Sequence, residues 1–141
     1  MKERILIVGG GLSGLTLAYL LSKRNIQAKI IEASPRLGGR IQTINGTLER
    51  PLELGATWFS DMHQNLCTLI DELGLKKFEQ FSKGKSLFQT KSFEPPQEFF
   101  VPESQSPSYR IKDGTQTLIV TLANQLDNEK IKLNTQVVAI T

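Results

Sequence analysis

The chain has 141 residues, of which 39% are hydrophobic and 22% charged, a length that suits one ordinary domain. This composition excludes a collagen-like, low-complexity or wholly disordered chain. Seventeen Lys and Arg against 14 Asp and Glu give a net charge of +3, and the basic residues are scattered, so we expect no nucleic-acid partner. The lone Cys67 and the lone His63 leave few ways to build a metal site or a hydrolytic triad, and we assign no metal ligand.

An uncharged run from Ile5 to Ser22 has the length of a short membrane span or a signal peptide. Four glycines interrupt this run, and no small-residue cleavage pattern follows it. We therefore expect neither a membrane segment nor secretion, and we expect a cytoplasmic protein.

The same run divides into a strand, a glycine turn and a helix. Ile5–Val8 is continuously apolar, which is typical of a parallel strand covered on both faces. Leu12–Arg24 has the broad apolar surface of a helix, and Asn25 is its expected C-terminal cap. Ala28–Ile31 then predicts a second strand. This order of elements predicts a right-handed βαβ unit.

The turn from Gly9 to Gly14 has the pattern G-x-G-x-x-G. Gly9 allows the tight turn, Gly11 allows a pyrophosphate to approach the backbone, and Gly14 allows the helix to pack closely on the strand. The N-terminus of the helix favours anions. Glu32 lies 18 residues beyond Gly14, near the spacing expected of a carboxylate that binds a ribose hydroxyl, and its charge disfavours NADP. The pattern predicts a dinucleotide site; the alternative is a glycine turn without a ligand.

The segment after Glu32 carries two arginines and two glycines, in the run Arg36-Leu37-Gly38-Gly39-Arg40. The planar fork of a guanidinium group suits bidentate contact with phosphate oxygens. We interpret this segment as part of the dinucleotide site; the alternative is a surface loop with solvated arginines.

At this point the chain resembles the flavin-containing amine oxidase superfamily, which includes monoamine and polyamine oxidases, protoporphyrinogen oxidase and phytoene desaturase-like enzymes. The resemblance covers residues 4–80 and returns over 110–141. It rests on the order and spacing of five elements, which are Ile7–Leu15, Ile31–Ala33, Arg36–Arg40, Leu54–Phe59 and Glu72–Leu75.

The resemblance implies FAD as the cofactor and a Rossmann-like FAD-binding α/β domain with a small β-rich insertion. It implies that the glycine turn lines the pyrophosphate, that Glu32 holds the adenosine ribose, and that Arg40 reaches the diphosphate while Arg36 closes over the adenosine. It also places the segment Gly55–Trp58 near the flavin ring and the ribityl chain, and the backbone of Val137 against adenine. Ser34-Pro35 departs from the family pattern, so we expect no contact between the side chain of Ser34 and the cofactor. The full set of implied cofactor residues is Gly9, Gly11, Leu12, Ser13, Gly14, Glu32, Ala33, Arg36, Gly39, Arg40, Gly55, Ala56, Thr57, Trp58 and Val137.

The residues between these segments predict connecting elements. Ile41–Ile44 and Thr47–Arg50 flank Asn45-Gly46, which predicts a hairpin with a type I′ turn. Trp58 and Phe59 are open to a second interpretation as core aromatics. A helix is expected near 62–73, with a capping box at Asp61 and Gln64, a stop at Gly74, and Met62 on its core face. We expect no catalytic role for His63 or Cys67.

Residues 76–112 contain six phenylalanines and four prolines, which predict short edge strands and loops around a small satellite core; the alternative is that the phenylalanines line a pocket. A helix after Asp113 and strands at Lys130–Leu133 and Val137–Ile140 follow. The expected division is a FAD-binding domain over 1–75 and 113–141, with 76–112 as a partial substrate-domain-like insertion.

These features favour the FAD-binding portion of a flavin-dependent amine oxidase-like oxidoreductase, acting in its complete form on a small molecule with a C–H bond next to an amine. We assign no catalytic residue and expect the isolated chain to be inactive. We expect a fragment whose first strand lies at an open sheet edge, where self-association can occur. A desaturase or porphyrinogen oxidase relative, a non-catalytic nucleotide-binding module and an NAD-binding domain remain open alternatives.

Overall fold

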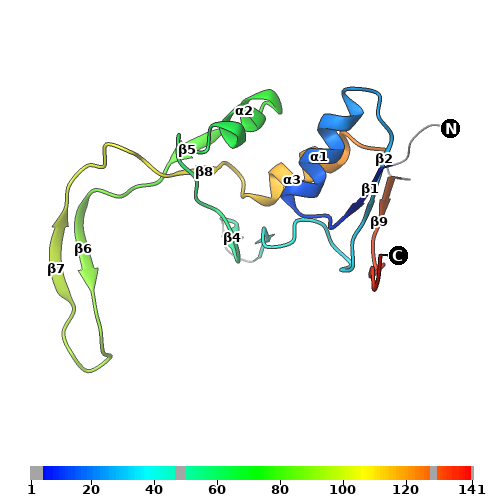
Figure 1. The fold of residues 1–141 in the computed structure, drawn as a ribbon. Coiled ribbons are helices and arrows are strands. Elements are labelled where there is room, and N and C mark those ends of the chain that lie inside the picture. The colour runs from blue at the N-terminus through cyan, green and yellow to red at the C-terminus, as the bar shows by residue number, and fades with distance from the viewer. Residues whose placement is uncertain (1–4, 47–49, 128–129, 141) are drawn as a thin grey trace.

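The computed structural model describes residues 5–46, 50–127 and 130–140. Its largest sheet has three parallel strands in the order β1-β2-β9, formed by β1 (Ile5–Val8), β2 (Ala28–Ile31) and β9 (Ile131–Lys132). Helix α1 (Leu12–Ser22) joins β1 to β2 and packs against both, and α3 (Gln116–Asn124) packs against α1 (Figure 1). The parallel β1–α1–β2 unit is confirmed, and both strands have their predicted bounds.

Helix α1 ends two residues earlier than its apolar pattern predicts, at Ser22. Asn25 adopts a left-handed φ of 58°, and the next N–H, of Ile26, donates to the carbonyl oxygen of Leu21 at 3.0 Å. This is the Schellman geometry, which closes a helix with its own last carbonyls. The predicted cap at Asn25 is therefore confirmed.

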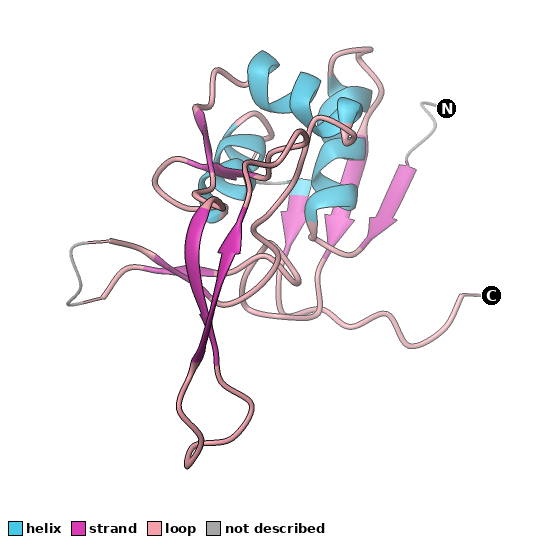
Figure 2. Ribbon diagram, turned by 90° about the vertical axis from the view of Figure 1, so that its left-hand side faces the viewer, coloured by secondary structure: helices cyan, strands magenta, loops and turns pink. Residues whose placement is uncertain are grey.

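The core lies between the sheet and the helices on one of its faces, as Figure 2 shows. Ile7 and Ile30 are buried on that face beneath α1 and α3. Leu6 and Val8 point to the opposite face, because side chains alternate along a strand, and they remain 56% and 57% exposed. The expectation that β1 is covered on both faces is thus wrong for the described residues, among which β1 is the end strand of its sheet.

A short hairpin of β3 (Thr43–Ile44) and β4 (Leu52–Glu53) carries the chain back toward Gly55. Ile44 pairs with Leu52, so the connection is longer than two residues and the predicted type I′ turn at Asn45-Gly46 is wrong. The predicted return strand 47–50 lies mostly outside the described residues, and Arg50 itself precedes β4.

Helix α2 (Gln64–Glu72) begins two residues later than predicted, and the predicted capping box is absent. Asp61 instead accepts a hydrogen bond from the Tyr109 hydroxyl at 2.9 Å. Met62, expected on the core face, is 85% exposed because it precedes the helix. The stop at Gly74 is confirmed by its φ of 67°.

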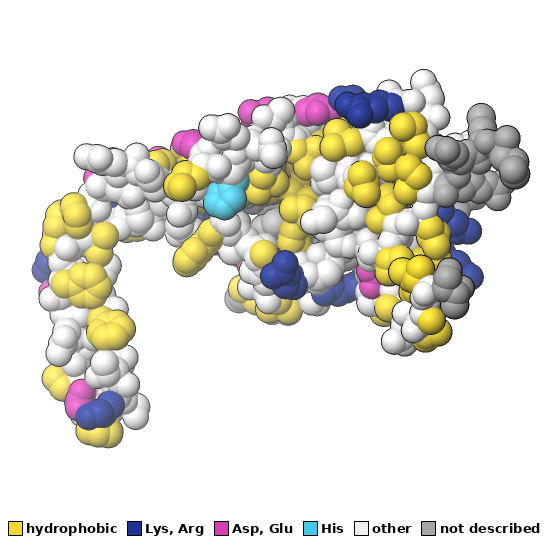
Figure 3. Space-filling view, viewed as in Figure 1, with side chains coloured by type: hydrophobic (Ala, Val, Ile, Leu, Met, Phe, Trp, Pro, Cys, Tyr) yellow, Lys and Arg dark blue, Asp and Glu magenta, His cyan; other side chains and the backbone are white. Residues whose placement is uncertain are grey.

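Residues 76–112 form two short antiparallel pairs, which confirms the expected strands and loops. The pairs are β5 (Lys77–Glu79) with β8 (Tyr109–Ile111) and β6 (Gly84–Phe88) with β7 (Gln97–Val101). The β6–β7 hairpin projects from the body of the molecule (Figure 1), and apolar side chains line its surface in Figure 3. The expected satellite core is therefore wrong, since six phenylalanines of this region are exposed: Phe78, Phe81, Phe88, Phe93, Phe99 and Phe100.

The chain after β9 runs without regular structure, so the strand predicted at Val137–Ile140 does not form. Val138 and Ile140 are almost fully exposed there. The apolar run has no described strand beside it to pair with, and exposed apolar side chains alone do not form a strand. Among the described helices, none combines the length and the apolar character that a membrane crossing requires.

Candidate dinucleotide-binding site

The glycine turn between β1 and α1 has the backbone geometry that its sequence predicts. Gly9 has a φ of 105°, a conformation that favours glycine. A Cβ on Gly14 would overlap the carbonyl oxygen of Gly9. Helix α1 therefore packs so closely on the turn that only glycine fits at this position. A Cβ on Gly11 would meet nothing within 4 Å, so the space over this residue is open. The two glycines thus have different roles: Gly14 allows close packing, whereas Gly11 faces open space at the N-terminus of α1.

Glu32 lies at the carboxyl end of β2, beside the glycine turn. One carboxylate oxygen accepts the N–H of Ser34 at 2.8 Å, and the other accepts the N–H of Gly10 at 2.7 Å. These two backbone donors stabilise the charged form and lower the pKa of Glu32 below its ordinary value. Glu32 therefore stays ionised at neutral pH and keeps free lone pairs for ribose hydroxyls.

The loop of residues 36–40 packs directly on the glycine turn. The Gly38 N–H donates to the carbonyl oxygen of Gly10 at 2.9 Å, and Gly11 and Gly38 form an isolated parallel bridge. Gly38 has a φ of 111°, and a Cβ there would lie 2.7 Å from the carbonyl oxygen of Ile41. The structure thus brings the two glycine-rich segments together, as the sequence predicts.

The two arginines of this loop have different surroundings. The Arg36 guanidinium donates to three carbonyl oxygens of its own loop, those of Leu37, Gly39 and Ile41, at 2.7–3.2 Å. Arg40 is exposed, and its side chain has no hydrogen bond or ion pair among the described residues. Arg36 therefore holds the loop, whereas Arg40 is available to a ligand.

The segment Gly55–Trp58 lies beside the end of the 36–40 loop. The Ala56 N–H donates to the Arg40 carbonyl oxygen at 3.1 Å, and a Cβ on Gly55 would overlap that oxygen. Trp58 is 68% exposed, so its interpretation as a core aromatic is wrong, whereas Phe59 is buried against Tyr109 with ring centroids 5.9 Å apart. Trp58 thus remains free to face a cofactor.

The chain after β9 passes beside Glu32. The Glu32 N–H donates to the Lys132 carbonyl oxygen, and the Thr135 N–H donates to the Glu32 carbonyl oxygen, both at 2.9 Å. Val137 follows two residues later, on irregular backbone rather than the predicted strand. The implied contact of its backbone with adenine stays a prediction.

Sequence reasoning missed a polar cluster that joins these segments to α3. Glu53 accepts the Thr115 N–H at 2.7 Å, and Thr115 is the one buried polar side chain among the described residues. The Thr57 and Thr115 hydroxyl oxygens lie 3.2 Å apart. The available signal was the lack of an acidic residue in the first turn of α3, which leaves its positive end to be compensated from elsewhere.

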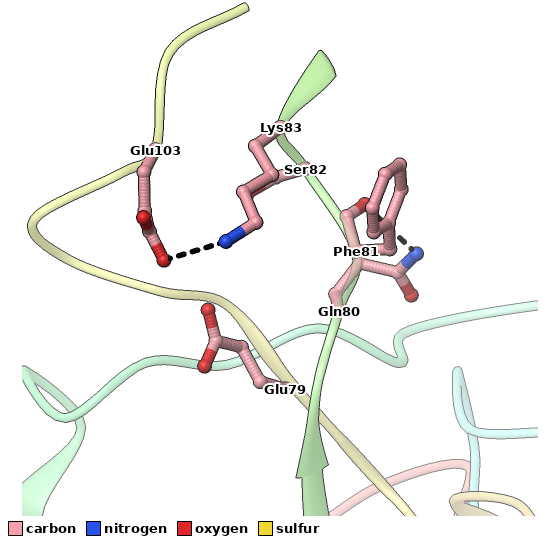
Figure 4. Close-up of a pocket in the computed structure, with 6 residues that line it drawn as sticks. All are labelled: Glu79, Gln80, Phe81, Ser82, Lys83 and Glu103. Atoms are coloured by element: carbon pink, nitrogen blue, oxygen red, sulfur yellow. Dashed lines mark hydrogen bonds and ion pairs between the residues drawn. The ribbon is translucent and has the colours of Figure 1, made fainter.

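Two cavities that share Glu79–Phe81 lie apart from the glycine turn. One, of about 250 Å³, lies where β5 leads toward the β6–β7 hairpin and is lined by Glu79–Lys83 and Glu103. Two of these residues, Lys83 and Glu103, form an ion pair of 3.0 Å (Figure 4). A larger one, of about 550 Å³, shares Glu79–Phe81 and extends to Glu53 and Gly114. Neither contains a residue of the glycine turn or of the 36–40 loop.

A family model described as flavin containing amine oxidoreductase matches residues 12–93, more than half of the chain. The chain belongs to this family. The matched residues begin at Leu12, in the second half of the glycine turn, and include Gly14, Glu32, both arginines and the Gly55–Trp58 segment. Membership of this family therefore implies FAD as the cofactor.

Individual relatives agree with this assignment. A probable flavin-containing monoamine oxidase A from Dictyostelium discoideum is 36% identical over 85 residues, which is 60% of this chain and 18% of that protein. Protoporphyrinogen oxidase 2 from Arabidopsis thaliana is 27% identical over 136 residues, 95% of this chain and 22% of that protein. The chain thus spans about a fifth of the length of these curated relatives.

Among solved structures, putrescine oxidase bound to putrescine has a TM-score of 0.76 at 19% identity, covering 95% of this chain and 51% of that one. At this low identity the likeness supports the fold alone, which is the α/β fold of a flavin-dependent oxidase. The expected Rossmann-like FAD-binding class is confirmed.

Proposed function

We propose that this chain binds FAD through the glycine turn, Glu32 and the 36–40 loop, as the cofactor-binding portion of an amine oxidase-like oxidoreductase. One observation carries the proposal: the open space over Gly11 lies at the N-terminus of α1, where the neighbouring Gly10 is bonded to the Glu32 carboxylate and the backbone of Gly39, next to the exposed Arg40, approaches Gly11. A diphosphate fits the helix end and Arg40, and ribose hydroxyls fit Glu32. The remaining implied residues, from Leu12 and Ser13 to Ala33 and Val137, border the same space in this proposal.

When bound, the flavin supplies an acceptor for a hydride equivalent from a C–H bond next to an amine. The chain's own residues bind and orient it, and none of the described side chains is assigned a catalytic role. We also propose that residues 76–112, with their exposed phenylalanines, belong to the substrate side of the complete protein. Small amines are the proposed substrates, by analogy with the relatives.

A second candidate is an oxidoreductase of the protoporphyrinogen oxidase type. The observation that favours it is the extent of that match, which covers 95% of this chain, against 60% for the monoamine oxidase relative. Both candidates share the FAD site and differ in the substrate. A non-catalytic nucleotide-binding module is the third outcome that experiment has to separate.

Titration of the purified chain with FAD tests the proposal. A ligand at a hundred times its Kd stabilises the folded state by about 2.7 kcal/mol, so we expect FAD to raise the Tm and NAD to leave it unchanged. Bound flavin absorbance should persist through gel filtration. A chain stabilised by NAD alone is an NAD-binding domain, and a chain stabilised by neither contradicts the proposed function.

The two arginines provide a matched pair of variants. We expect Arg40→Ala to keep the wild-type Tm and to weaken FAD binding about tenfold, since it removes a charge-assisted contact and no internal bond. We expect Arg36→Ala to lower the Tm and speed amide exchange in residues 37–41, because three backbone carbonyls lose their donor. Equal FAD affinity in Arg40→Ala and wild type would remove Arg40 from the site.

A further inference from the structure

Helix α3 begins without a cap of its own. Its N-cap residue, Thr115, makes no side-chain capping bond, and its first turn has no acidic residue. The first backbone N–H groups are satisfied from elsewhere: Glu53 accepts the Thr115 N–H at 2.7 Å, and Thr43 accepts the Gln116 N–H at 2.9 Å. A carboxylate from β4, 62 residues away in sequence, thus compensates the positive end of α3.

The same carboxylate connects several segments. Its second oxygen accepts the Thr43 hydroxyl on β3 at 2.9 Å. The Thr115 hydroxyl, 3.3 Å from the first oxygen, lies 3.2 Å from the hydroxyl of Thr57. Thr115 is only 6% exposed, so water cannot easily replace these partners. Glu53 therefore lies where β3, β4, α3 and the Gly55–Trp58 segment meet.

The Gly55–Trp58 segment has few other attachments. Its backbone is hydrogen-bonded through Ala56 to Arg40 and, beyond its end, through Phe59 to Tyr109. Between these two anchors the Thr57 side chain makes the described polar contact, and Trp58 itself is 68% exposed. Between the two anchors, the Thr57–Thr115 contact thus joins the segment to Glu53.

We propose that Glu53 is a positioning residue, which fixes the Gly55–Trp58 segment through Thr115 and Thr57. The consequence for the cofactor rests on the proposed function, because that segment is the one placed beside the flavin. The local claim, that Glu53 sets the mobility of Trp58, does not require a cofactor. The two claims therefore fail separately.

Trp58 is the single tryptophan of the chain, so its fluorescence reports this segment without a label. We expect Glu53→Ala to increase the fast component of the Trp58 anisotropy decay in the cofactor-free chain. Thr57→Val should do the same while leaving the α3 cap intact. Glu53→Gln keeps an acceptor for Thr115 but places an amide donor against Thr43, whose hydroxyl now donates to Glu53 and would lose this acceptor, so its effect should be intermediate.

The control is Glu72→Gln, which removes the negative charge from the contacts of Glu72 with Tyr19 and Lys23 between α2 and α1, outside the Thr57–Thr115–Glu53 connection. It should lower the Tm and leave the Trp58 anisotropy unchanged. With FAD present, Glu53→Ala should also weaken binding about tenfold, as the loss of a charge-assisted bond predicts.

Wild-type anisotropy in both Glu53→Ala and Thr57→Val overturns the inference, as does an equal change in Glu72→Gln. If Glu53→Ala fails to fold, Glu53→Gln and Thr57→Val carry the same comparison. A wild-type chain that does not bind FAD contradicts the proposed function, while the cofactor-free anisotropy still decides the role of Glu53.

Discussion

Alanine substitution at two glycines of the same turn is expected to have opposite consequences. Gly14→Ala should lower the free energy of unfolding by about 1–3 kcal/mol, the typical cost of overpacking a closed site. The added Cβ would overlap the carbonyl oxygen of Gly9, which is backbone and can move only by shifting β1 away from α1. Alanine is a better helix former than glycine by about 1 kcal/mol, which offsets only part of this loss.

Gly11→Ala should leave the fold nearly as stable, because its Cβ meets nothing within 4 Å and its φ of −77° is accessible to alanine. The same methyl group occupies the open space proposed for the diphosphate, so FAD affinity should fall by at least about tenfold, or 1.4 kcal/mol. Urea unfolding measures the first effect, and FAD titration the second. A destabilised Gly11→Ala, or a Gly11→Ala with wild-type affinity, contradicts the assignment of Gly11 to the diphosphate.

The parts of the fold predicted well from sequence are those set by local chemistry. The strands at Ile5–Val8 and Ala28–Ile31 follow from continuous apolar runs. The caps at Asn25 and Gly74 and the glycine turn follow from backbone conformations that few residue types adopt. The arginine–glycine loop was predicted beside the turn because it directly follows β2. Local signals of this kind do not depend on what the distant chain contributes.

The predictions that failed depended on distant partners. The Asn45-Gly46 signal favours a tight turn, but the pairing of Ile44 with Leu52 selects a longer connection. The phenylalanines of residues 76–112 have an apolar pattern, but the described chain provides no surface to cover them. The contact of Glu53 with Thr115 spans 62 residues; the first turn of α3, which has no acidic residue, indicates that a partner is needed but does not identify it.

Replacement of Glu32 is expected to weaken FAD binding by about 1–3 kcal/mol, since its carboxylate is proposed to accept ribose hydroxyls through charge-assisted bonds. Glu32→Ala also leaves the N–H groups of Gly10 and Ser34 without their partner, so its Tm should fall. Glu32→Gln keeps one acceptor oxygen, so its loss of folding free energy should be smaller than its loss of FAD binding free energy. Titration of both variants with FAD and with free adenosine diphosphate separates the adenosine diphosphate contacts from the flavin contacts, since both ligands contain adenine, ribose and diphosphate and only FAD contains the flavin.

The same carboxylate gives a pH dependence whose sign is fixed by its surroundings. Because the backbone donors hold the pKa of folded Glu32 below the ordinary value of 4.5, its contribution to stability is complete above that pH and is lost as the pH falls through the folded pKa. The Tm of Glu32→Gln should therefore decline less between neutral and acid pH than that of the wild type. Glu72→Gln is the matched control, because the pKa of Glu72 is also lowered, first by Lys23 and then by Tyr19, yet Glu72 lies outside the glycine turn. Both variants should flatten the acid limb of the stability profile, but only Glu32→Gln should reduce FAD affinity at neutral pH. Equal FAD affinity in Glu32→Gln, Glu72→Gln and wild type would show that this carboxylate shapes the turn without touching the cofactor.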